Sequence, residues 1–310
     1  MNEHLQPQTM GGLPPPSAPL APADAIATYL APRTLEEALT ALRAGPVTIF
    51  AGGTDVMPQS RSGRVRLNPT LMNIRRIPDL RGISEGDGFM RFGALTTITE
   101  LLENAQVRAR FNALWQSCDH FASGQLRNAA TLGGNICNAS PAGDTIIPLL
   151  ALDARIVLAS QAEDGAATTR TMPLAAFFVA PGRTRRRPEE LLIAVEVPLP
   201  PEGFVSEFYK FGTRPALDIS AISIGLGALP AAGALTNVRV AFGAVAPTPI
   251  RAAKTESALE GRPLAAAMDA ALAAADADIC PISDVRASAW YRRELVRNVL
   301  RGMLDHVGRG

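Results

Sequence analysis

The sequence predicts an α+β protein that folds into more than one compact unit. Its 310 residues are too many for one minimal domain, and a 47% share of apolar residues is enough for two or three cores. Short strand patterns alternate with helical patterns over residues 25–202, whereas longer strands followed by two helices fill the rest. The change falls at Pro198–Pro201, which we take as the predicted domain boundary.

The first unit is predicted to begin after a tail. Residues 1–24 are rich in Pro and Gly and carry few large apolar side chains, so they are expected to be flexible. Thr34 and Glu37 have the spacing of a capping box at a helix start. The apolar stripe of that helix is Leu35, Leu39 and Leu42. Gly45 and Pro46 end it, and Val47–Phe50 has the pattern of a short buried strand.

The remaining elements of residues 25–202 follow from similar patterns. Strands are expected at 70–74, 89–92, 155–159 and 191–197, helices at 99–102 and 109–118, and an apolar run at 146–152. Residues 122–144 are polar and Gly-rich, which predicts no regular structure there. We therefore expect two α/β lobes, at about 25–80 and 81–202.

The second unit, residues 203–310, is predicted as a small α+β domain. Strands are expected at 204–212, 219–229 and 238–245, and helices around 264–275 and 290–304. A run of strands followed by a run of helices is typical of an α+β domain, in which a sheet packs against helices.

Composition excludes several classes of function. The net charge is +1 and the longest basic block is Arg185–Arg187, which we interpret as a solvated loop, so nucleic acid is not an expected partner. The 3 cysteines lie far apart without a CxxC pair, which favours a reducing cytoplasm over a disulfide framework. The 3 histidines lack metal-ligand spacing, so no metal site is expected. No apolar run is long enough for a membrane span, and no signal peptide is apparent.

A first Gly-rich segment follows the strand at Val47–Phe50. Gly52 and Gly53 lack the Cβ atoms that would prevent a ligand from approaching the backbone, and glycine tolerates positive φ. Successive N–H groups can then hold phosphate oxygens, with the Thr54 hydroxyl as a further donor. A simple tight turn is the alternative interpretation of this segment alone.

A second Gly-rich segment runs from Thr131 to Ile136 and is followed by Asn138–Pro141 and Asp144. Glycines among hydroxyl, amide and carboxylate groups indicate backbone wrapped around a polar ligand, and Asp144 could accept hydrogen bonds from a ribose. The alternative is a loop held by its own Asx turns.

Several familiar motifs are missing from the sequence. There is no G-x-G-x-x-G after a strand, no Walker A loop, no G-x-S-x-G and no H-E-x-x-H. Two phosphate-binding loops without a nucleophile or general base predict a cofactor whose own ring performs the chemistry. We therefore expect no catalytic side chain.

Both glycine segments together resemble the paired FAD motifs of the xanthine dehydrogenase and carbon monoxide dehydrogenase flavoproteins. The matching stretches are Ala51–Asp55 and Ala130–Ile136, with Ala139–Pro141 and Asp144 behind them. Further matches are Arg187–Leu192, Tyr209–Lys210, Asp218–Ile219, Gly243–Pro249 and Tyr291–Leu295, so the resemblance covers about residues 31–304.

The resemblance implies a vanillyl-alcohol-oxidase type of FAD-binding domain followed by a small C-terminal domain. It implies that FAD is held by Ile49, Phe50, Ala51, Gly52, Gly53, Thr54, Asp55, Val56, Phe121, Thr131, Gly134, Asn135, Asp144, Leu192 and Lys210. The first eight would wrap the pyrophosphate, Asp144 the ribose or ribityl hydroxyls, and Leu192 and Lys210 the flavin end. Lys210 could stabilise reduced anionic flavin by its charge.

The same resemblance implies a subunit and not a complete enzyme. A large molybdopterin subunit would hydroxylate the substrate, and a small iron–sulfur subunit would pass electrons to the flavin, from which NAD or another acceptor takes them. Purines, other N-heterocycles, aldehydes and carbon monoxide stay open as substrates. Cys137 stands alone, so the extra cluster of some relatives is not expected here, and we predict a small buried residue at that position. A self-contained FAD oxidase and a flavin-free scaffold are the alternatives.

Overall fold

The computed structural model describes residues 26–214 and 218–309, so the predicted tail at 1–24 lies outside the described residues. The first lobe is a three-stranded parallel sheet with the order β1-β3-β2. Its strands are β1 (Thr28–Leu30), β2 (Val47–Phe50) and β3 (Thr70–Asn73), and its helices are α1 (Leu35–Ala44) and α2 (Val56–Arg61). Single 3₁₀ turns follow at Ile74–Arg76 and Pro78–Leu80.

The start of α1 differs slightly from the predicted capping box. The Thr34 hydroxyl accepts a hydrogen bond from the Glu37 N–H at 3.2 Å, as predicted. The Glu37 carboxylate instead accepts from the N–H of Arg33, one residue before the cap, at 2.7 Å. Both bonds still satisfy backbone donors at the helix end, so the helix begins where the sequence predicted.

The second lobe is a five-stranded antiparallel sheet with the order β4-β5-β10-β6-β7. The strands are β4 (Ile83–Glu85), β5 (Phe89–Gly93), β6 (Arg155–Gln161), β7 (Ala167–Pro173) and β10 (Leu191–Pro198). A small hairpin, β8 (Phe178–Ala180) and β9 (Arg183–Thr184), precedes β10, with a 3₁₀ turn at Leu174–Ala176 before it. Buried Val157 and Ile193 share one core with Leu39 and Met72 of the first lobe, so the two lobes pack against each other.

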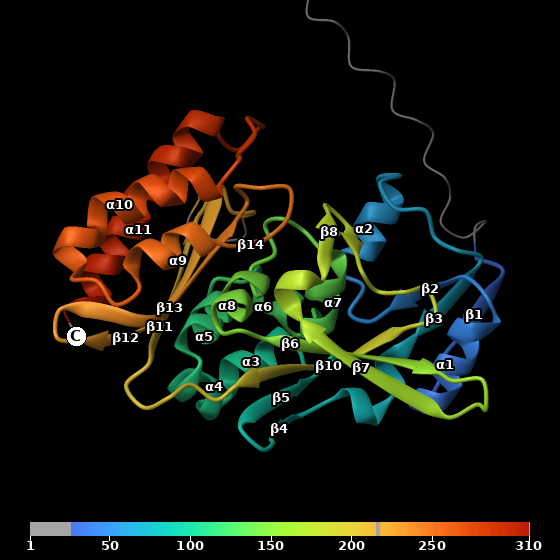
Figure 1. Ribbon diagram of the computed structural model, residues 1–310. Helices are drawn as coiled ribbons and strands as arrows, with labels where there is room; N and C mark the ends of the chain where they lie inside the picture. Colours follow the sequence, from blue (N-terminus) through green and yellow to red (C-terminus); the bar gives the residue numbers. More distant parts are fainter. Residues whose placement is uncertain (1–25, 215–217, 310) are drawn as a thin grey trace, which may run out of the picture.

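Helices of the second lobe share one core with the five-stranded sheet (Figure 1). They are α3 (Ile98–Glu103), α4 (Ala105–Arg110), α5 (Asn112–Asp119), α6 (Gly124–Arg127), α7 (Leu132–Asn138) and α8 (Ile146–Ala151). The prediction that residues 122–144 lack regular structure is therefore wrong. Thr131 caps α7, and Leu132 and Ile136 are fully buried, so tertiary burial stabilises a helix whose glycines disfavour it locally.

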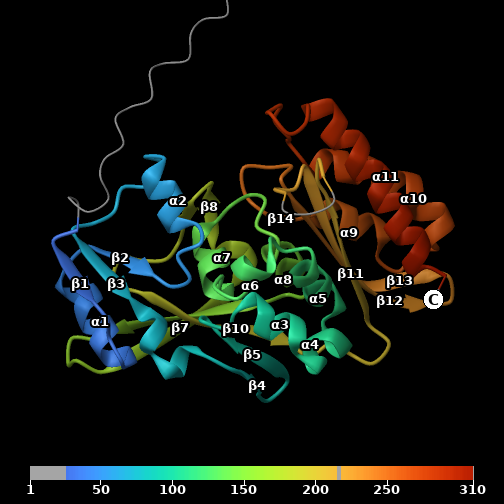
Figure 2. The same cartoon turned by 180° about the vertical axis from the view of Figure 1, so that it is seen from behind.

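The C-terminal part is a four-stranded antiparallel sheet with helices on both faces. Its strands are β11 (Val205–Phe211), β12 (Ile222–Ala231), β13 (Ala234–Gly243) and β14 (Ile250–Arg251), and its helices are α9 (Ala253–Leu259), α10 (Leu264–Asp278) and α11 (Ala289–Val307). Helices α9–α11 cover one face, and α5 and α8 of the preceding lobe lie against the other (Figures 1 and 2). Gly225 permits this close packing, because a Cβ there would lie 3.0 Å from the Ile147 carbonyl oxygen. The α+β class is confirmed.

Candidate functional site

The main cavity lies between the first and second lobes and has a volume of about 410 Å³, within the range of cofactor sites. Twelve of the predicted FAD contacts line it: Ile49, Ala51, Gly52, Gly53, Thr54, Asp55, Val56, Phe121, Thr131, Gly134, Asn135 and Leu192. Phe50, Asp144 and Lys210 do not line this cavity. The structure thus brings both glycine segments to one site, together with the start of β10.

The first segment provides free backbone donors. Within the described part of the chain, the N–H groups of Gly52, Gly53, Thr54 and Asp55 donate no hydrogen bond to protein. Gly53 has φ +74°, and a Cβ there would lie 2.5 Å from the Phe50 ring, which packs beneath the loop. The Phe50 ring therefore packs against Gly53 and supports the conformation of the loop. A row of unpaired N–H groups at a glycine turn is suited to phosphate oxygens.

The second segment contributes differently, because its own N–H groups are used within the protein. Leu132 and Gly133 donate to the carbonyls of Thr96 and Ala94, both at 2.9 Å, and Gly134 donates to the Thr131 hydroxyl at 3.1 Å. The Asn135 side-chain oxygen accepts from Thr145 at 2.8 Å, which leaves its NH₂ group without an acceptor among the described residues. This segment therefore forms a wall of the cavity and offers an amide side chain.

The two segments touch at Gly52. A Cβ at this position would lie 2.0 Å from the carbonyl oxygen of Ala129, just before the second segment. Gln59 of α2 also donates to Asn138 at the end of α7, at 2.9 Å. Contacts between loops far apart in sequence therefore set the width of the cavity.

Asp144 and Lys210 form a buried ion pair beside the cavity. Lys210 Nζ lies 2.8 Å from Asp144 Oδ2 and also donates to the His120 carbonyl at 3.3 Å. The side chains are only 7% and 12% exposed, and Asp144 Oδ1 is buried without a hydrogen-bond partner. Burial raises the pKa of Asp144 to about 6, although the charge and hydrogen bond of Lys210 act in the opposite direction. Lys210 also lines a second, more open hollow with His120 and residues 208–214.

Sequence reasoning missed part of the cavity wall. Additional residues that line it include Thr48, Gln59, Arg66, Asn68, Asn138, Gly182 and Arg186. Arg186 belongs to the block that we had interpreted as a solvated loop, and that interpretation is wrong for this residue. Only the neighbouring match at Arg187–Leu192 could have drawn attention to it.

Cys137 also differs from its prediction, because its side chain is exposed at the cavity wall. Desolvation within the cavity raises the pKa of this thiol to about 11, and the nearby charge of Arg186 acts in the opposite direction. The group is therefore a neutral thiol at neutral pH and not an activated nucleophile.

Comparisons with known proteins agree with this architecture. The family model described as "FAD binding domain in molybdopterin dehydrogenase" matches residues 24–200, and "CO dehydrogenase flavoprotein C-terminal domain" matches 207–307. The xanthine dehydrogenase FAD-binding subunit of Escherichia coli O157:H7 is 32% identical, with 91% of this chain and 96% of that protein covered. The nicotinate dehydrogenase FAD-subunit of Eubacterium barkeri is 31% identical, with 90% and 95% covered.

Solved structures give the same result. A chain of carbon monoxide dehydrogenase from Hydrogenophaga pseudoflava superposes with a TM-score of 0.83 at 28% identity, covering 89% of this chain and 95% of that one. A chain of the reconstituted CO dehydrogenase from Oligotropha carboxidovorans gives 0.85 at 26% identity, covering 91% and 97%.

Fold and site together define an FAD-binding flavoprotein built from a two-lobed domain and a helix-covered C-terminal sheet. The chain belongs to the family of FAD-binding subunits of molybdenum hydroxylases, and its relatives are subunits of oxidoreductases. This finding favours the predicted subunit over the self-contained oxidase. No helix of the described residues is long and apolar enough to cross a membrane.

Proposed function

We propose that the chain holds one FAD in the main cavity and carries electrons from a small iron–sulfur subunit to NAD or another acceptor. A large molybdopterin subunit would hydroxylate the substrate. The observation that carries this proposal is the row of unpaired N–H groups at residues 52–55, which faces the wall formed by α7. The three free cysteines fit a reducing cytoplasm as the location.

The residues present fit FAD by their chemistry. Four unpaired N–H groups match the oxygens of a pyrophosphate, and the absent Cβ atoms of Gly52 and Gly53 let this loop pack closely against Ala129 and Phe50. Asp144, which the family resemblance assigns to the ribityl or ribose hydroxyls, lies outside the cavity wall, and its unpartnered Oδ1 is buried. Apolar Phe121 and Leu192 line the same cavity and can pack against a ring.

Each group would then have a separate task. Bound FAD supplies the redox step, which no side chain of the site has to perform. The backbone of residues 52–55 binds and orients the phosphates, and Asn135 offers its NH₂ group from the opposite wall. Lys210 holds Asp144 in place through the 2.8 Å ion pair. Because that pairing compensates its charge, the role of Lys210 would be to position Asp144 more than to stabilise a reduced ring.

The proposal is tested on the purified chain. We expect a yellow protein whose acid precipitation releases one FAD per chain, because the Cys137 thiol is neutral and no activated nucleophile lies at the cavity. Chromatography of the supernatant distinguishes FAD from FMN. A colourless protein that takes up no FAD on addition, or flavin that stays on the precipitate, would contradict the proposal.

A further inference from the structure

The turn between β9 and β10 contains a buried carboxylate that the proposed FAD contacts do not use. Glu190 is 2% exposed and accepts two hydrogen bonds from Arg170 of β7, at 2.5 and 2.8 Å. It also accepts from the N–H of Arg187 at 2.7 Å. Although burial raises the pKa of Glu190, the hydrogen bonds from Arg170 and Arg187 outweigh it and the pKa is lowered, so the group stays charged.

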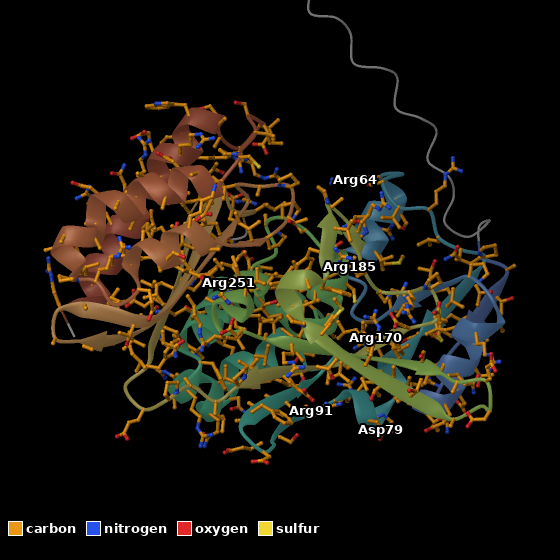
Figure 3. All side chains as sticks on the ribbon, in the orientation of Figure 1. Arg64, Asp79, Arg91, Arg170, Arg185 and Arg251 are labelled. Carbon is orange, nitrogen blue, oxygen red and sulfur yellow. The ribbon has the colours of Figure 1, made fainter. Side chains whose placement is uncertain are left out.

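This buried pair fixes the shape of the turn. Arg170 also donates to the carbonyl of Arg185 at 3.1 Å, so it holds both ends of the segment 185–190. Figure 3 shows Arg185 near β8 and α7, with Arg170 below it on β7. Burying a carboxylate costs free energy unless all its hydrogen-bond donors are in place. These hydrogen bonds therefore hold the turn in one well-defined conformation.

The fixed segment 185–190 also holds the side chain of Arg186. One nitrogen, Nη1, donates to the carbonyls of Arg187, Pro188 and Glu190 at 2.9, 3.1 and 2.6 Å. The other two nitrogens, Nη2 and Nε, have no acceptor among the described residues. Arg186 lines the main cavity, and it is close enough to Cys137 of α7 to influence its pKa. The guanidinium is therefore anchored by one nitrogen and leaves two donors for a ligand in the cavity.

We propose that Arg186 is the cation that binds the pyrophosphate of FAD, and that buried Glu190 is the residue that positions it. The inference rests on the proposed function. The pyrophosphate is the only anionic group of FAD, and a guanidinium recognises phosphate oxygens through two parallel donors. Arg66 also lines the cavity, but it is exposed and has no side-chain tether among the described residues. Of these two arginines, Arg186 is the one that hydrogen bonds to the protein hold in a fixed orientation.

The test measures affinity and not enzyme activity. The full-length chain is freed of flavin and titrated with FAD, and bound FAD is then displaced with ADP or with adenosine. Arg186→Gln should weaken the binding of FAD and of ADP about 10- to 100-fold, the range expected for the loss of a charge-assisted hydrogen bond. The affinity for adenosine, which has no phosphate, should change less than about twofold. Arg185→Gln removes the same charge one residue away, outside the cavity wall, and should bind FAD like the parent.

A double-mutant cycle separates positioning from general stability. Glu190→Gln should weaken FAD binding about 3- to 10-fold in the parent, and it should hardly change FAD binding in the Arg186→Gln background. A purely structural Glu190 would lower the melting temperature in both backgrounds and weaken FAD equally in both. If Arg186→Gln does not fold, Arg186→Lys keeps the charge without the planar fork and should still weaken FAD measurably.

The outcomes keep the two proposals apart. A parent chain that binds no FAD overturns the proposed function. A parent that binds FAD, with Arg186→Gln or Arg186→Lys binding it equally well, overturns only the inference. Equal weakening of ADP and adenosine also overturns it, because the lost contact would then not involve phosphate.

Discussion

Lys210 Nζ lies 2.8 Å from Asp144 Oδ2 and joins strand β11 to the loop that precedes α8. The family resemblance assigned Asp144 to the ribose or ribityl hydroxyls of FAD and Lys210 to its flavin end, yet the structure pairs the two side chains with each other. One oxygen of Asp144 is therefore occupied, and the other is buried and free. The pair connects the two-lobed part of the chain with the C-terminal sheet.

The pKa of Asp144 makes the stability of the flavin-free chain depend on pH. Burial raises it from 3.8 to about 6, so the folded state holds this proton more tightly than the unfolded chain. The contribution to the free energy of unfolding is therefore largest below about pH 4 and is lost as the pH rises to about 6. At 1.36 kcal/mol per pKa unit, the loss is up to roughly 3 kcal/mol.

Asp144→Asn cannot ionise and isolates this effect. Relative to the parent, the variant should gain stability in urea unfolding between pH 4 and pH 7. Parallel stability curves for parent and variant over this range would show that Asp144 does not titrate there.

The glycines of the first segment should be intolerant of side chains. Gly52→Ala places a methyl group 2.0 Å from the Ala129 carbonyl oxygen and should push the two loops apart. Gly53→Val meets the Phe50 ring and adds strain of about 1–3 kcal/mol at φ +74°. Both variants should fold but purify with little FAD, as measured by the flavin absorbance per chain.

Gly124→Ala is the matched control, because an added Cβ there meets nothing within 4 Å and the residue begins helix α6. It should retain the FAD content of the parent. Near-normal FAD in folded Gly52→Ala or Gly53→Val would count against the assignment of the first segment.

Much of the fold could be predicted because its elements have strong local signals. Strand β2 is followed, after Ala51, by two glycines, so both the strand and the loop after it follow from sequence. By contrast, β7 is an edge strand of Ala, Thr, Arg and Met with mostly exposed residues, and no apolar alternation marks it. Helix α7 was missed for another reason, since its stability comes from the buried faces of Leu132 and Ile136.

The site shows the same division. The glycine pair Gly52 and Gly53 can be recognised in the sequence. Its contacts with Ala129 and Phe50, however, depend on how the chain folds. Arg186 stands in a run of three arginines, and nothing local distinguishes it from Arg185. Its difference arises from the three carbonyls of a turn that Glu190 fixes.

The C-terminal part should depend on one buried arginine. Arg292 of α11 is 2% exposed and donates to the carbonyls of Ala221 and Ala244 and to Asp284. Arg292→Leu would leave these acceptors without a donor, so we expect a loss of about 3–5 kcal/mol in unfolding free energy. Arg301→Leu on the same helix breaks only an exposed pair with Asp269 and should cost less than about 1 kcal/mol. Equal unfolding midpoints in urea for the two variants would contradict this role.

The chain should function only with partner proteins. The chain belongs to the family of FAD-binding subunits of molybdenum hydroxylases, so under the proposed function hydroxylation takes place on a partner subunit. Affinity tagging of the chain in its native host should therefore recover one larger and one smaller companion. Electron transfer requires short distances, so the complex should cover the surface near the flavin and bury more than about 1,000 Å² in total. Hydrogen exchange of the free and assembled chain would locate that surface. A chain recovered alone, which oxidises an organic substrate with oxygen, would instead support the self-contained oxidase.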